Sequence, residues 1–328
     1  MKNMDRPEIK PEIKEATVIS INKICRQQGV AIILVLLIVA IATSLASHMA
    51  MQQNLWQRQV ESQFDRAQAR QLGLAGIDWA RALLAEDAQG SNMDHDKEIW
   101  TLRLPAIPVE GGEVIGAIED RQGLLNLNNV ATNVAPFQRL LAVLGLPAEL
   151  APALADWLDA DEETQAGGAE DGYYLALAQP YRASNHQLVD MSELMKVKGF
   201  DHRTIDSLRA FVSVLPVAQT AVNQTLVNVN FAPAEVLVAV IQGLSLSDAR
   251  LLVQLRAGQP FKDIGDFKKR LLNTRTDVVD NDIRDISVKS EFFWVTGRAS
   301  VGRAQVVTQA LLQRASNNWP TVVWQSVQ

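Results

Sequence analysis

Cysteine is nearly absent from this chain of 328 residues. Its single copy, Cys25, precedes a long apolar run, so the sequence after it has no thiol. An intrachain disulfide and a thiolate metal site are therefore excluded there, which suits an oxidising compartment. Hydrophobic residues make up 48% of the chain and charged residues 21%, which is typical of a globular protein and not of a disordered one.

Catalytic motifs are equally scarce. The chain has no phosphate-binding loop, no G-x-G-x-x-G and no G-x-S-x-G. Its four histidines do not form the H-E-x-x-H spacing of zinc hydrolases, and the stretch from Asp94 to Asp96 is interpreted as a polar loop. A serine–histidine–aspartate triad stays open, because its members meet in space and not in sequence. No pattern favours one, and we expect a protein that is not an enzyme.

Basic residues are fewer than acidic ones. Lysine and arginine number 31 against 37 acidic residues, for a net charge of −6. The first 29 residues hold more basic than acidic side chains, so the rest of the chain is more acidic than the whole. Nucleic-acid binding depends on clustered lysine and arginine. The composition therefore argues against a nucleic-acid partner.

The longest apolar run spans residues 30–42 and fades by about residue 51. A membrane-spanning helix needs about 20 such residues and a signal-peptide core about 7–15, so length does not decide between them. Ser44 and Ala46 also fit the small-x-small pattern of ordinary signal peptidase, which would start a secreted chain at Ser47. Basic residues just before the run place the leader in the cytoplasm and the body of the protein outside it.

The helical pattern continues beyond the apolar run. Between Val30 and Leu72 there is no glycine or proline to break a helix. We predict one helix from Val30 to about Leu84; two helices with a kink near Gly73 and Gly76 are the alternative. Apolar residues recur at helical spacing among polar ones; they are Leu55, Trp56, Val60, Phe64, Ala67, Leu74, Ile77, Trp79, Leu83 and Leu84.

This N-terminus resembles that of type IV pilins and type II secretion pseudopilins: a short basic stretch, a glycine, and an apolar helix that continues into a soluble domain. The resemblance implies that a prepilin peptidase cuts between Gly29 and Val30 and methylates the new N-terminus. Most members carry a glutamate at the fifth mature position, where this chain has Leu34. A carboxylate in a bilayer is costly unless paired, and its partner in pilins is the amine of a neighbouring subunit. A subunit with nothing docked ahead of it does not need that glutamate.

Strand-like patterns flank a long helical region. Residues 100–104 and 113–118 are predicted strands on either side of a proline- and glycine-rich turn, and residues 287–315 alternate around Gly302 like a hairpin. Residues 321–324 are predicted to form a further edge strand. Between these blocks, leucine, alanine and aspartate follow helical spacing. Because the flanking strands must still pair, we predict that the helical region is an insertion.

We therefore expect an α+β fold, in which a long pilin-like N-terminal helix packs on a small antiparallel sheet. A large all-α domain of SAM-like or helix-hairpin-helix type is inserted. The expected boundaries are a leader over residues 1–29, a transmembrane half-helix over 30–51, the first part of the pilin-like domain over 52–128, the insert over 129–284 and the C-terminal strands over 285–328.

Three glycines between helical segments, Gly145, Gly199 and Gly243, mark hairpin-like repeats in the insert. They resemble helix-hairpin-helix modules, in which glycine permits the tight turn and its backbone N–H can meet a phosphate. The DNA-binding version has a second glycine two residues on and basic neighbours, whereas this chain has Ser245 and neutral or acidic surroundings. A packing module is favoured, and a membrane-tethered DNA receptor is the alternative function.

The densest acidic stretch is DWLDADEETQAGGAEDGYY, residues 156–174. Calcium takes about six to eight oxygen ligands, but the spacing is not that of an EF-hand, and a solvated acidic loop is the alternative. D-W-x-D-x-D followed by G-A-E-D-x-Y-Y resembles the helical domain of the pseudopilin K family, which binds calcium. The resemblance implies calcium as a cofactor, with Asp159, Asp161, Glu170 and Asp171 as candidate ligands.

The resemblance to the pseudopilin K family covers nearly the whole chain, and the lack of a glutamate at position 34 is that family's signature. It implies a minor pseudopilin at the tip of the type II secretion pseudopilus, which initiates the pseudopilus, limits its length and serves export of folded proteins from the periplasm. The implied partners are the I and J pseudopilins, the prepilin peptidase and the inner membrane, which the chain crosses once with its C-terminal domain in the periplasm. A secreted calcium-dependent enzyme is a third interpretation, and it requires loss of residues 1–46.

Overall fold

The computed structural model describes residues 24–328 apart from residue 104 and residues 218–223, 275–282, 284 and 316–318. Most of the predicted leader, residues 1–23, therefore lies outside the described residues, and only the helical backbone is described for residues 24–28. The chain divides into two compact units, residues 1–64 and residues 65–328.

The first unit is helical wherever it is described. Helix α1 (Ile24–Gly90) runs through it without interruption, because residues 30–64 contain neither glycine nor proline. The large apolar side chains between Val30 and Leu45 are exposed on every side of the helix and not along one stripe. Of the described helices, α1 alone is long and apolar enough to cross a membrane. The helix predicted from Val30 to about Leu84 is confirmed, and it extends farther at both ends.

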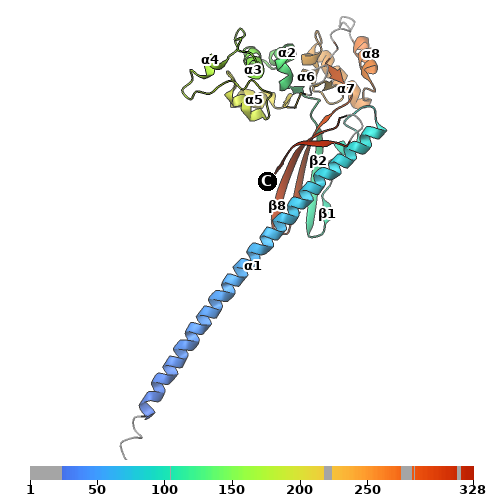
Figure 1. Cartoon of the computed structure of the whole chain (residues 1–328). Coiled ribbons are helices and arrows are strands. Elements are labelled where there is room, and N and C mark those ends of the chain that lie inside the picture. The colour runs from blue at the N-terminus through green and yellow to red at the C-terminus, as the bar shows by residue number, and fades with distance from the viewer. Residues whose placement is uncertain (1–23, 104, 218–223, 275–282, 284, 316–318) are drawn as a thin grey trace, which may run out of the picture. The chain divides into compact units, whose positions relative to one another are not determined.

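In the second unit the last turns of α1 lie along one face of a five-stranded sheet (Figure 1). Gly73 lies in this interface, and a Cβ on it would clash with the side chain of Thr308. Gly73 therefore permits close approach to the sheet and does not break the helix, so the alternative of two helices is wrong. The buried contact joins Ile77, Ala80 and Leu84 of α1 to Ile118, Phe293, Val295, Ala310 and Leu312 of the sheet.

The sheet is antiparallel throughout, with the strand order β1-β2-β7-β8-β9. The hairpin predicted around Gly302 is confirmed as the β7–β8 turn, where Gly302 has a φ of +51°. The strands predicted over residues 113–118 and 321–324 are confirmed as parts of β2 and β9. The five strands are β1 (Ile107–Val109), β2 (Gly112–Asp120), β7 (Phe292–Val301), β8 (Ala304–Gln313) and β9 (Thr321–Val327).

The strand predicted over residues 100–104 is wrong. Ile99–Thr101 form a 3₁₀ helix, η1, and residue 104 lies outside the described part of the chain. Trp100 is buried beside the sheet, with its ring edge-on to that of Phe293 and 5.1 Å between the ring centroids. An aromatic side chain that fills a gap next to a sheet has the same local pattern as a strand residue, and only the packing tells them apart.

A long, mainly helical insert joins β2 to β7. It also contains four two-residue strands, which pair in parallel as β3 with β4 and β5 with β6. The prediction of an all-α insert is therefore wrong in this respect. Strands of two residues are too short to give a period in the sequence, so the sequence did not reveal them. Its elements are β3 (Leu125–Asn126), η2 (Leu127–Ala131), α2 (Ala135–Leu144), α3 (Leu150–Leu158), α4 (Asp171–Tyr174), η3 (Met191–Lys196), α5 (His202–Leu208), β4 (Val212–Ser213), β5 (Val227–Asn228), α6 (Ala234–Val240), α7 (Leu246–Gly258), α8 (Ile264–Thr274) and β6 (Ile286–Ser287).

The strand pairs divide the insert into two halves built on one plan. Each half opens with an N-x-N segment and closes on the short strand that pairs with its start. The asparagines are buried, and their amides hold backbone groups of distant segments. Asn128 accepts a hydrogen bond from the N–H of Leu188, and Asn230 both donates to and accepts from the backbone of Phe261. These bonds satisfy polar groups in a core that is otherwise apolar.

The three glycines predicted to turn the chain between helices are confirmed in that role. Gly145, Gly199 and Gly243 have φ values of 65°, 85° and 80°, which lie in the left-handed region. Glycine adopts this region without the steric penalty that a Cβ brings.

Candidate metal centre

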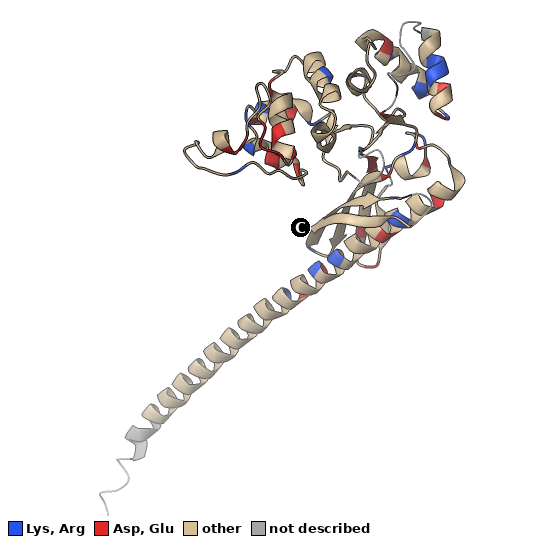
Figure 2. Cartoon of the chain, turned by 45° about the horizontal axis from the view of Figure 1, so that its top comes forward, with Lys and Arg blue, Asp and Glu red and all other residues tan. Residues whose placement is uncertain are grey.

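Three acidic side chains converge where α3 ends and α4 begins. Asp156 lies in the last turn of α3, Asp159 is the residue that follows the helix, and Glu170 precedes α4. One carboxylate oxygen of each lies within 4.8 Å of the others. Asp156 is 0% exposed and Glu170 is 5% exposed. Figure 2 shows acidic residues gathered in this part of the insert, whereas basic residues gather on α8.

These three side chains, the α3–α4 carboxylates, are poorly supplied with hydrogen-bond donors. Both oxygens of Glu170 and the Oδ1 of Asp159 are buried without a partner among the described residues. Asp156 accepts a bond from the N–H of Gln165 at 3.1 Å. No lysine or arginine in the described part of the chain forms an ion pair with any of the three. Buried carboxylates without partners are unfavourable unless protons or a cation neutralise them.

The pKa values of the α3–α4 carboxylates reflect this surplus of negative charge. Burial raises the pKa of Glu170 from its ordinary value of 4.5 to about 7, and the neighbouring charges of Asp156 and Asp159 add to the rise. Burial raises the pKa of Asp156 and of Asp159 as well. The group therefore holds protons more tightly than ordinary carboxylates do, and a cation would compete with those protons.

Two glycines shape the loop that closes over Asp156. Gly167 has a φ of +92°, which favours glycine, and a Cβ on Gly168 would clash with the carboxylate of Asp156. The Nζ of Lys198 donates to the carbonyl of Gly168 at 2.8 Å and to that of Gly167 at 3.2 Å. The glycine pair therefore lets the backbone pass directly beside the carboxylate, and Lys198 holds it there.

The structure brings together two of the four predicted ligands. Asp159 and Glu170 belong to the α3–α4 carboxylates. Asp161 is exposed and accepts from the N–H of Glu163. Asp171 is engaged elsewhere, because it accepts from the N–H of Ala183 and lies 3.1 Å from the guanidinium of Arg182.

Asp156 is the residue that sequence reasoning passed over. It belongs to the acidic stretch, next to Trp157 and Leu158, but it is not among the four predicted ligands. All three are buried in the structure. A carboxylate one position from two large apolar residues was the available signal that this side chain faces the interior.

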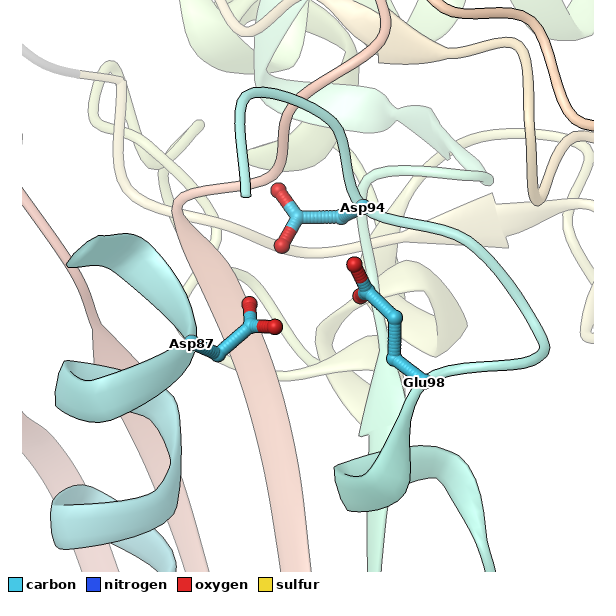
Figure 3. Close-up of side chains that lie close together, drawn as sticks. All are labelled: Asp87, Asp94 and Glu98. Carbon is cyan, nitrogen blue, oxygen red and sulfur yellow. The ribbon is translucent and has the colours of Figure 1, made fainter. Parts of the chain in front are cut away.

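A second group of carboxylates lies in the pilin-like part of the chain. Asp87 near the end of α1, Asp94 in the following loop and Glu98 just before η1 point toward one another (Figure 3). Arg314 reaches this group through ion pairs with Asp87, at 2.9 Å, and with Asp94. The interpretation of residues 94–96 as a mere polar loop is wrong for Asp94, which is 1% exposed because it anchors this buried arginine. The cation at this second group is thus a protein side chain.

The α3–α4 carboxylates are therefore the better candidate for a metal ion. Their oxygens are the hard ligands that Ca²⁺ and Mg²⁺ prefer. Their unpartnered oxygens and raised pKa values fit a bound cation, whereas the second group already has one in Arg314.

Two family models described as type II secretion system protein K match the insert, one over residues 123–217 and the other over residues 227–288. A protein from Pseudomonas aeruginosa named Type II secretion system protein K is 34% identical over 314 residues, which cover 89% of this chain and 90% of that protein. The chain belongs to the protein K family of the type II secretion system. A protein of the same name from Klebsiella pneumoniae is 32% identical and covers 90% of this chain and 95% of its own length.

The fold also agrees with a solved structure. A chain in the crystal structure of the GspK-GspI-GspJ complex from the enterotoxigenic Escherichia coli type 2 secretion system matches with a TM-score of 0.71 and 24% identity. The match covers 82% of this chain and 99% of that chain. The α+β fold with its long N-terminal helix is thus confirmed. The alternative function as a DNA receptor gains no support from the protein K family.

The two family matches coincide with the two halves of the insert. The first match contains the α3–α4 carboxylates, and the second contains α6, α7 and α8. The candidate metal centre therefore lies within the part of the chain that defines the protein K family.

Proposed function

We propose that this chain is a minor pseudopilin, whose function is assembly of the type II secretion pseudopilus and not catalysis. The precursor is cut between Gly29 and Val30 by prepilin peptidase, and the new N-terminus is methylated. Residues 30–51 cross the inner membrane once, and the C-terminal domain stands in the periplasm. There the protein serves the export of folded proteins.

The observation that carries this proposal is helix α1 itself. Its first part presents apolar side chains on all sides, which suits contact with lipid and with other apolar helices. Its last turns form part of the core of the sheet domain. One helix thus contains both an apolar segment that suits a membrane and turns that belong to the core of the sheet domain.

The position in the pseudopilus follows from Leu34 and from the insert. Leu34 leaves the membrane segment without a carboxylate to receive the amine of a preceding subunit. The insert between β2 and β7 makes the head much larger than an ordinary pilin head. Both features favour the tip, where this protein initiates the pseudopilus and limits its length. The I and J pseudopilins are its partners in this proposal, because the solved structure that this chain matches is that of a GspK-GspI-GspJ complex.

The test of this function is the mass of the mature protein isolated from membranes of cells that contain the secretion system. We expect a chain that begins at methylated Val30 and remains in the inner membrane. A chain that begins at Ser47 would contradict the proposal, because it would lack the segment that anchors and assembles the subunit.

Calcium is the ion that we propose for the α3–α4 carboxylates. Asp156, Asp159 and Glu170 supply carboxylate oxygens, and bound calcium would offset their mutual repulsion and hold the loop between α3 and α4 to the helices. Three carboxylates are fewer than the ligands that Ca²⁺ takes, so backbone carbonyls and water would complete the shell.

Glu170→Gln is expected to weaken calcium binding by at least about tenfold, because it removes a charged ligand from a buried site. Wild-type protein should gain several degrees in melting temperature when calcium replaces EDTA, and the variant should gain much less. Terbium luminescence excited through Trp157, next to Asp156 in the chain, gives a direct reading of occupancy. Glu162→Gln is the matched control, since Glu162 is an exposed member of the same loop.

The pH dependence gives a second reading of the same experiment. Because the pKa of Glu170 is raised in the folded state, ionising it destabilises the metal-free fold. Metal-free protein should therefore lose stability as the pH rises from about 4.5 to about 7, and calcium should remove that loss. Equal stability of wild type and Glu170→Gln across this range, with and without calcium, would contradict the calcium site.

A further inference from the structure

The five-stranded sheet has two edges that differ in how they are protected from pairing with another chain. β1 is only three residues long and contains Pro108, which has no N–H to offer. β9 is seven residues long, TVVWQSV, with neither a proline nor a charged side chain. In the described part of the chain, β8 is its only strand neighbour. Charges and prolines are the usual protection of an exposed edge, and β9 has none.

The register identifies the backbone groups of β9 that remain free. Gln328 and Val307 of β8 exchange both of their backbone hydrogen bonds, each at 2.9 Å. Bonded and non-bonded pairs alternate along an antiparallel ladder, so Gln325 and Val327 stand in non-bonded pairs with β8. Their N–H and C=O groups therefore point away from β8, toward the outer side of the sheet.

Apolar side chains accompany these free groups. Trp324 is 41% exposed and stacks on Trp294 of the neighbouring part of the sheet, with 5.3 Å between the ring centroids. The register shifts between Leu311 and Leu312, so Val323 has no partner in β8, and it is 40% exposed. The edge thus offers an aromatic platform and a valine next to unpaired backbone groups.

The start of β9 is held in place by α1. The Nε of Arg81 donates to the carbonyl of Pro320 at 2.7 Å, and its guanidinium lies over the ring of Trp319. The residues just before β9 are therefore anchored to α1, and the strand itself pairs with β8. An edge that is already ordered loses little conformational entropy when it binds.

We propose that the outer edge of β9 binds an extended segment of another polypeptide by strand addition. Alternating N–H and C=O groups along an ordered edge are matched by another extended backbone, and not by a helix or by a small anion. The segment that fits is uncharged and free of proline, because it lies beside an uncharged apolar edge. Apolar or aromatic side chains at every second position would pack next to Trp324 and Val323.

The test uses the full mature chain in detergent and a fluorescein-labelled ten-residue peptide of alternating threonine and valine with a central phenylalanine. Fluorescence anisotropy should show saturable binding to the wild type. Gln325→Pro removes one outward N–H and should weaken binding by at least about tenfold. Gln325→Ala keeps that N–H and should stay within about twofold of the wild type. Unchanged melting temperatures would show that both variants are folded.

A second probe does not depend on any variant. The same peptide N-methylated at every residue keeps its side chains but cannot donate along either edge, and it should not bind. Strand addition is overturned if the wild type does not bind the first peptide, or if it binds both peptides equally. A wild-type chain that dimerises, and whose dimer Gln325→Pro abolishes, would show instead that the edge pairs with a second copy.

Discussion

Gly29→Val is expected to leave the protein at precursor length and to reduce type II secretion to background. The fold does not require glycine at this position, because a Cβ on Gly29 would meet no atom within 4 Å. Valine is also well tolerated in an apolar helix next to a bilayer. We therefore expect the effect to come from loss of the glycine that the proposed cleavage by prepilin peptidase requires before Val30. The measurements are the mass of the membrane-bound protein and the amount of an exported enzyme outside the cells.

Gly90→Ala provides the matched control for this experiment. Gly90 is also in α1, and a Cβ on it would likewise meet nothing within 4 Å. The control should be processed normally and should support full secretion. If Gly29→Val is processed, or secretes as well as the control, then the proposed cut after Gly29 is incorrect.

Arg314→Met is expected to destabilise the pilin-like part of the protein by about 3–5 kcal/mol. Arg314 is 5% exposed and donates to Asp87, to Asp94 and to the carbonyls of Leu84 and Ser290. Its removal leaves buried carboxylates without a cation. Methionine fills similar volume, so the loss of charge and not a cavity dominates. Guanidinium unfolding followed by tryptophan fluorescence measures the change, because Trp100 is buried beside the same region.

Three further samples separate charge from packing. Arg298→Met alters an exposed arginine on β7 and should change the free energy of unfolding by less than about 0.5 kcal/mol. Adding Asp94→Asn to Arg314→Met should restore part of the loss, because the unpaired charge is gone. Burial and the charges of Asp87 and Asp94 raise the pKa of Glu98 to about 7, so Glu98 is protonated at pH 5. The group then carries less negative charge for Arg314 to neutralise, and the loss of stability in Arg314→Met should be smaller at this pH. A defect that is the same at every pH and in the double variant would mean that Arg314 acts only by filling space.

Local chemistry was enough to predict the long helix and the β7–β8 hairpin. The absence of glycine and proline over residues 30–64 predicts a helix, because nothing in that stretch disfavours the backbone. Gly302 between two alternating segments predicts the β7–β8 hairpin, since period-two patterns and turn residues act over a few positions. The pilin-like start beside Leu34 also pointed to the family that the relatives confirm.

The functional side chains needed more than local pattern. The sequence by itself determined that acidic residues crowd residues 156–174, but it did not tell which of them meet. Asp156 and Glu170 come together where Trp157 of α3 packs against Tyr174 of α4, with 5.1 Å between the ring centroids, whereas Asp171 forms an ion pair with Arg182. The spacing of acidic residues along a loop does not indicate which of their carboxylates come together in the fold.

Only the tertiary structure decided which partner each buried charge has and which backbone groups at the sheet edges stay unpaired. Asp94 and Arg314 are 220 residues apart in the chain, and no local signal connects them. The free groups of Gln325 and Val327 depend likewise on the register between β8 and β9. Burial and pairing are set by segments that are far apart in the chain and meet only in the folded protein. The sequence therefore determined the long apolar helix and the β7–β8 hairpin, whereas packing determined the short elements, the partners of the buried charges and the exposed edge of the sheet.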